Sequence, residues 1–119
     1  MASSGPAGQA VLVTECTGVF VVLLQGTFDH QRDLDLLDMA LEAGHLTAKQ
    51  VIIDLSRTKD LSARMLNTLL RQRHRAGSLP WLAGPLSAPV TRRLEITGTL
   101  KHFTVFATLR EAAAHNRDQ

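Results

Sequence analysis

Short runs of apolar and β-branched residues open the chain, and this pattern is typical of β-strands. One run covers residues 10–16 and the next covers residues 18–25, and Thr17-Gly18 at their junction is a turn signal. The pattern therefore predicts two strands that pair as a hairpin.

A helix is expected next, over residues 30–43. Leu34, Leu37 and Leu41 recur there on one helical stripe, and the acidic residues of the segment fall mostly elsewhere. Gly44 is predicted to end this helix, because glycine is common just past a helix C-terminus.

The middle of the chain predicts a strand followed by a second helix. Val51–Leu55 is almost entirely apolar, as in strands covered on both faces, so we expect it to be the central strand. The helix is expected from about Ser62 to Arg75, with Gly77 ending it. Its apolar stripe consists of Met65, Leu66, Leu69 and Leu70.

The last third of the chain again alternates between predicted strands and predicted helices. Residues 79–83 read as a strand, in which Pro80 indicates an edge or a strand start. Ser87 is expected to cap a third helix that Gly98 ends. A short strand over residues 102–106 and a terminal helix over residues 108–114 complete a mixed sheet with helices packed on it.

Length and composition indicate one ordinary globular domain. The chain has 119 residues, of which 45% are hydrophobic and 20% charged, and its formal charge of +2 is too small for a dedicated nucleic-acid binder. We expect a flexible tail over residues 1–9, a domain over residues 10–115 and a short tail over residues 116–119.

The single cysteine and the N-terminus bear on the compartment. Cys16 has no partner within the chain for a disulfide, which fits a reducing environment, and we expect it to be a small buried side chain in a strand. The first residues lack a positively charged leader, and the apolar run 19–24 is too short to span a bilayer. These features predict a cytoplasmic protein.

Motifs that carry catalysis are missing from the sequence. It has neither a Walker-type phosphate loop nor a Gly-x-Ser-x-Gly elbow, and its five histidines are scattered without metal-ligand spacing. We therefore expect no enzyme activity, no metal site and no cofactor.

Three segments, in order, carry a family resemblance. They are Gly26-Thr-Phe-Asp-His30, then Val51-Ile-Ile-Asp-Leu-Ser56 ahead of a Leu-rich helix, and finally Gly84 to Gly98 followed by Phe103-x-Val-Phe106. In this arrangement the chain resembles the STAS proteins of the bacterial anti-sigma-factor antagonist family. The resemblance implies an α/β (α+β) fold with a mixed sheet of about four to five strands and about four helices, packed mainly on one face.

The same resemblance implies a non-enzymatic partner-binding protein that acts on an anti-sigma factor of the kinase type. Family members carry Asp-Ser-Ser/Thr-Gly-Leu at the start of the second helix, where the kinase phosphorylates the first serine. The segment from Ser62 to Leu66 aligns with this motif, which puts Ala63 at the acceptor position and Met65 at the glycine. Ala63 has no hydroxyl and cannot be phosphorylated.

Ser62 has two interpretations. It is either a relocated phospho-acceptor or an N-cap that replaces the aspartate of the family, and we favour the cap because serine and aspartate cap helices about equally well. A phosphate at this helix end would not need to unfold the protein, since the helix dipole favours negative charge there, and its effect would fall on the partner.

The partner-binding surface is expected around the start of the second helix and the loop before the first. Its residues are Asp29, His30, Ser62, Ala63, Arg64, Asn67, Thr68 and Arg71. Asp29 and Asp33 either shape recognition or cap and compensate the first helix. The basic residues from Arg71 to Arg75 are interpreted as a solvated helix end, with an acidic partner surface as the alternative.

A second function class stays open. The chain could be a STAS subunit or scaffold of a larger complex, either transporter-associated or part of a stress-signalling assembly, and co-purification would distinguish the two. In either case we expect a protein partner, no nucleic acid and no membrane insertion, with the chain a monomer or weak homodimer.

Overall fold

A computed structural model describes residues 10–28 and 30–117, and five strands form one mixed sheet in it. The strands lie in the order of the chain, and β1 pairs with β2 in antiparallel orientation while the other neighbours are parallel. Their bounds are Ala10–Cys16 for β1, Val19–Gln25 for β2, Gln50–Asp54 for β3, Trp81–Ala83 for β4 and Val105–Phe106 for β5. The expected hairpin and the central strand are confirmed.

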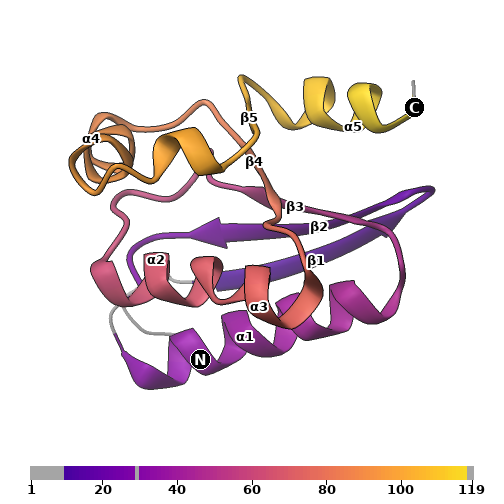
Figure 1. The fold of residues 1–119 in the computed structure, drawn as a ribbon, viewed down its shortest axis with the longest axis horizontal. Helices are drawn as coiled ribbons and strands as arrows, with labels where there is room; N and C mark the ends of the chain where they lie inside the picture. Colours follow the sequence, from indigo (N-terminus) through magenta and orange to yellow (C-terminus); the bar gives the residue numbers. More distant parts are fainter. Residues whose placement is uncertain (1–9, 29, 118–119) are drawn as a thin grey trace, which may run out of the picture.

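The helices lie on both sides of this sheet (Figure 1), and most of them pack on one face. They are α1 (Gln31–Leu46), α2 (Ala63–Leu70), α3 (Gln72–Ala76), α4 (Ala88–Ile96) and α5 (Leu109–Arg117), with a 3₁₀ turn η1 at Leu100–His102. The predicted fold class is therefore confirmed, with α5 as the helix on the opposite face.

Two apolar clusters hold the layers together. The larger one joins the sheet to α1, α2 and α4, and the smaller one lies between the sheet and α5. Val51 and Ile53 face the larger cluster, whereas Ile52 faces the smaller one beside Ala112. This explains why β3 lacks polar alternation, since both of its faces are covered.

The first helix does not end at Gly44, as the sequence had suggested, but continues to Leu46. Gly44 is buried where α1 crosses the sheet, and a Cβ there would lie 2.7 Å from Phe20 Cδ1 and 2.9 Å from Val51 Cγ2. The glycine therefore allows a close approach between helix and sheet.

The expected second helix is interrupted at Arg71, which separates α2 from α3. The break coincides with the buried side chain of Gln72, whose Nε2 donates to the Thr68 carbonyl at 3.0 Å and whose Oε1 lies 2.9 Å from His45 Nε2. This amide joins α3 to α1. Gly77, at φ +82°, ends α3 as predicted.

Four features of the remaining chain differ from the sequence prediction. The strand expected over residues 79–83 begins only at Trp81, directly after Pro80, which supplies no backbone N–H to the sheet. The strand expected over residues 102–106 is shortened to two residues, because η1 precedes it and Phe103 turns into the larger cluster. The terminal helix extends to Arg117, and Asn116 Nδ2 donates to the Gly18 carbonyl at 3.0 Å. Cys16 is exposed rather than buried, because it ends the edge strand β1.

Candidate functional site

The loop after β2 and the loop after β3 are bonded to each other, and together they position the start of α2. The Gly26 N–H donates to the Arg57 carbonyl at 3.0 Å, and the Lys59 N–H donates to the Gly26 carbonyl at 3.1 Å. Thr58, which is buried, donates its hydroxyl to the Leu24 carbonyl at 2.8 Å. These contacts satisfy backbone groups of both loops and fix the loops relative to each other.

Ser62 occupies the N-cap of α2 and uses its hydroxyl twice. Its Oγ accepts a hydrogen bond from the Met65 N–H at 3.1 Å and donates one to the Phe28 carbonyl at 2.9 Å. The N-cap interpretation is confirmed, and the second bond ties the helix start to the loop after β2.

Residues of α4 and its N-cap also bind the segment that leads into α2. Arg93 Nε donates to the Leu61 carbonyl at 2.9 Å, and the Ser87 hydroxyl donates to the Lys59 carbonyl at 3.1 Å. Ser87 also caps α4, as predicted. The residues that lead into α2 are therefore fixed by contacts to β2, to the loop after it and to α4.

Ala63 is the first residue of α2, and its methyl group is exposed beside the capped serine. Met65, two residues later, is fully buried in the larger apolar cluster. A side chain at the position of the glycine in the family motif thus points into the core and does not cover the surface that a partner would approach.

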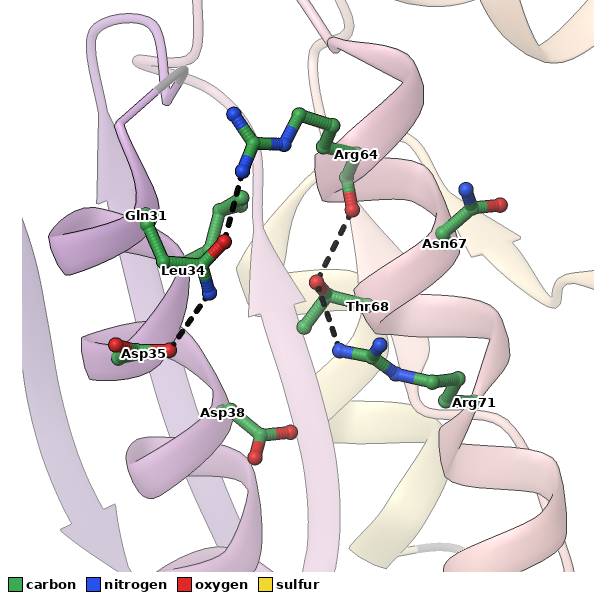
Figure 2. A pocket seen from close by; sticks show the side chains of 8 residues that line it. All are labelled: Gln31, Leu34, Asp35, Asp38, Arg64, Asn67, Thr68 and Arg71. Atoms are coloured by element: carbon green, nitrogen blue, oxygen red, sulfur yellow. Dashed lines mark hydrogen bonds between the residues drawn. The ribbon is translucent and has the colours of Figure 1, made fainter.

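A pocket of about 180 Å³ opens between α1 and α2 (Figure 2). We call it the α1–α2 pocket, and it is lined by Gln31, Leu34, Asp35, Asp38, Arg64, Asn67, Thr68 and Arg71. Arg64 Nη2 donates to Gln31 Oε1 at 2.7 Å, and Gln31 Nε2 donates to Asp35 Oδ1 at 2.8 Å. This relay carries a contact from α2 across to α1.

On the α2 side of the pocket the polar groups are also ordered by local bonds. The Thr68 hydroxyl donates to the Arg64 carbonyl at 3.0 Å and accepts from Arg71 Nη2 at 3.4 Å, as Figure 2 shows. Arg64 on α2 and Arg71 at its C-cap thus line the same pocket as the carboxylates Asp35 and Asp38 on α1. The pocket carries both signs of charge, which suits a protein surface better than a single anion.

The structure brings together the site residues that the sequence placed on α2. Ala63, Arg64, Asn67 and Arg71 are exposed, whereas Thr68 is buried. The hydroxyl of Thr68 donates to the Arg64 carbonyl and accepts from Arg71, so it is engaged within this part of the chain. His30 is exposed at the N-cap of α1 without a capping side-chain bond.

Two acidic residues near the first helix were also considered. Asp29 lies outside the described residues. Asp33 lies in the first turn of α1, where a carboxylate compensates the helix dipole.

The sequence prediction missed the contribution of α1 to the pocket. Gln31, Asp35 and Asp38 follow one another at helical spacing, so their common face was detectable. The contact between this face and α2 could not be detected from the sequence, because it depends on how the two helices pack. Within the described residues, no group of three or more histidine, cysteine or acidic side chains could hold a metal ion.

Comparisons with known proteins identify solved structures that share this fold. No protein-family profile matches the chain, and no curated protein matches it either. Among solved structures, an anti-sigma factor antagonist from Mycobacterium paratuberculosis is 29% identical, with a TM-score of 0.77 over 98% of this chain and 100% of that one.

Two further structures agree in fold. The anti-sigma factor antagonist SpoIIAA in its unphosphorylated form is 18% identical, with a TM-score of 0.76 over 92% of this chain and 98% of that one. A putative anti-sigma factor antagonist from Thermotoga maritima is 15% identical, with a TM-score of 0.71 over 90% and 94% of the two chains.

The helices of the described ranges include none that is both long and apolar enough to cross a membrane. The resemblance drawn from the three sequence segments is confirmed by the solved structures. The chain has the SpoIIAA-like α/β fold, and its structural neighbours over nearly its full length include anti-sigma factor antagonists.

Proposed function

We propose that this protein is an anti-sigma factor antagonist that binds a kinase-type anti-sigma factor through the start of α2 and is not switched by phosphorylation there. Proteins of this family are non-enzymatic partner-switching proteins. The proposal combines their fold with the chemistry of one position in this chain.

The observation that carries the proposal is the environment of Ala63. Its methyl group is exposed at the first turn of a helix whose N-cap hydroxyl, on Ser62, is already engaged with the Met65 N–H and the Phe28 carbonyl. A kinase acting on Ser62 would have to break the bond that its hydroxyl donates to the Phe28 carbonyl, whereas at Ala63 there is no oxygen to receive a phosphate.

The surroundings of Ala63 support a role in binding. The exposed side chains of Arg64 and Asn67 lie on the same helix, next to the α1–α2 pocket. Arg64 is held toward α1 by Gln31, so part of the surface is ordered before a partner arrives. Such preorganisation lowers the entropy cost of association.

The first test addresses phosphorylation. The wild-type protein and the variant Ala63→Ser are incubated with the cognate anti-sigma kinase and ATP, and the intact masses and modified sites are determined by mass spectrometry. We expect no stoichiometric phosphate on the wild type and one phosphate on the introduced serine. A stoichiometric phosphate on any wild-type residue, Ser62 included, would refute the claim of constitutive binding.

The second test addresses the binding surface and has a matched control. Ala63→Glu places a carboxylate on the first residue of α2, and Ala88→Glu places one on the first residue of α4, which is also exposed and also follows a serine N-cap. Both changes favour the helix dipole, so neither should lower stability.

The two variants are then compared for affinity to the anti-sigma factor by calorimetry. We expect Ala63→Glu to weaken binding by about tenfold or more, which corresponds to about 1.4 kcal/mol, and Ala88→Glu to leave it unchanged. Equal affinities for the two variants would remove the start of α2 from the interface.

A further inference from the structure

Helix α1 has a second apolar stripe, which does not face the core. Leu36, Met39 and Leu46 are 47%, 65% and 83% exposed, and Ala43 between them is exposed as well. We call these four residues the α1 seam. At about 100° per residue they fall within an arc of about 80° on the helix surface.

The seam is distinct from the stripe that holds α1 to the sheet. The buried residues of the helix are Leu34, Leu37, Ala40, Leu41 and Gly44, and their mean direction lies roughly opposite to that of the seam. In Figure 1, α1 forms the outer edge of the helical layer, so its far side is turned away from the sheet.

The spacing of the seam is that of a coiled coil. Positions 36, 39, 43 and 46 are separated by three, four and three residues, which is the alternation of a and d positions in a heptad. A surface helix that only covers a core needs one apolar stripe, and α1 already has one. The second stripe therefore fits the apolar face of another helix.

Charge beside the seam identifies the kind of helix. Asp35 and Glu42 occupy the flanking g positions, and α1 as a whole carries four carboxylates against the single arginine Arg32. The four carboxylates are Asp33, Asp35, Asp38 and Glu42. Residues at e and g positions select the partner through charge pairs, so the complementary helix has lysine or arginine along that side.

The acidic residues of α1 disfavour a second copy of this chain and an anionic membrane as the binding partner of the seam. In an antiparallel pair of two copies, Asp35 and Glu42 of each copy would face those of the other, and a parallel pair would still align two acidic helices without compensation. A membrane surface with anionic lipids prefers helices whose polar face is basic, and the polar face of α1 is acidic.

From these observations we propose that the α1 seam is a second docking surface, which binds a basic amphipathic helix of a protein partner. The mean direction of the seam lies about 110° around the helix from that of the α1 residues that line the α1–α2 pocket, and Asp35 lies at the border between the two. The apolar residues of the seam do not line the pocket, so substitutions at Met39 and Leu46 leave the surface around Ala63 unchanged.

The experiment uses the full chain and a designed probe. The probe is a fluorescent helical peptide of about three heptads with leucine at a and d and lysine at the flanking positions. A second peptide carries glutamate in place of lysine. Fluorescence anisotropy should show that the lysine peptide binds, that the glutamate peptide binds at least about tenfold more weakly, and that salt reduces the difference.

Variants of the protein localise the binding. The double variant Met39→Gln/Leu46→Gln removes the two most exposed seam residues, and Ile96→Gln, at an apolar residue of α4 that is 74% exposed, is the matched control. The double variant should bind the lysine peptide at least about tenfold more weakly, and the control should bind like the wild type. Thermal unfolding should show that both variants are folded.

Other outcomes overturn the proposal. Failure of the lysine peptide to bind, or equal binding by the double variant, would remove the seam as a docking surface. A wild-type dimer in sedimentation velocity that dissociates in the double variant would identify a second copy as the occupant. Seam-dependent binding to phosphatidylcholine vesicles, with or without phosphatidylserine, would identify a lipid surface instead.

Discussion

Replacing Ser62 by alanine tests how the start of α2 is held in place. The change removes one oxygen that accepts from the Met65 N–H and donates to the Phe28 carbonyl. Ser62 is half-buried, so water replaces these partners incompletely. The backbone hydrogen bonds of α2 are otherwise unaffected, because Ser62 precedes the helix with an extended backbone that alanine can also adopt.

The magnitude follows from the two bonds. Loss of a serine N-cap costs about 1 kcal/mol, and loss of a typical intramolecular hydrogen bond costs about 1 kcal/mol more. Together they predict that Ser62→Ala lowers the free energy of unfolding by about 2 kcal/mol. For a chain of this size, the melting temperature should fall by roughly 8 °C.

Urea unfolding followed by circular dichroism measures this loss, with two companion variants. Ser62→Thr retains a hydroxyl and should recover most of the stability. Ser56→Ala changes an exposed serine of the same loop, whose backbone N–H bond to Asp54 remains, and should stay within about 0.5 kcal/mol of the wild type. If Ser62→Ala were no less stable than Ser56→Ala, the cap and the Phe28 contact would not hold the helix start.

Three further variants test the rest of the framework. Gly44→Val should lower the free energy of unfolding by about 1–3 kcal/mol, because its side chain would overlap Phe20 and Val51. Ala43→Val, on the exposed side of α1, should lower it by less than about 1 kcal/mol. Urea unfolding of the two variants measures the difference. Gln72→Leu should cost about 1–3 kcal/mol by leaving the Thr68 carbonyl and His45 without their partner, and unchanged thermal stability would contradict that role. Asn116→Ala should cost about 1 kcal/mol and increase amide hydrogen exchange in α5, which mass spectrometry can follow.

Local sequence signals were enough to predict most elements of this fold. The apolar run of β3 and the serines that precede α2 and α4 are such signals, because strand burial and helix capping leave a mark within a few residues. The same holds for Gly77, whose left-handed backbone ends α3.

Features that depend on distant contacts could not be predicted in this way. Gly44 looked like a helix end, but its role is set by Phe20 and Val51, which lie elsewhere in the chain. Cys16 looked like a buried strand residue, but β1 turned out to be an edge. In both cases the tertiary neighbours decide what a locally ambiguous residue does.

Some residues of the candidate site could be predicted from local sequence signals, and others could not. The positions of Ser62 and Ala63 at the start of α2 were predicted because they follow from capping and from the leucine spacing. The contribution of Gln31 and Asp35 was missed because it depends on the packing of α1 beside α2. A single sequence gives the face of each helix but not which faces meet.

The contacts around α2 show which parts of its structure depend on the side chain at position 63. The helix start is fixed by Ser62, by the bonded loops and by Arg93 from α4, and none of these contacts involves the side chain of Ala63. The support of the surface is therefore independent of the group that a kinase would modify. Under the proposed function, replacing serine by alanine at this position removes the phosphate switch and leaves a preorganised surface, so the affinity for the partner should be retained. A second surface offers a route of regulation that needs no phosphate at this position, and the α1 seam is the second surface that we propose.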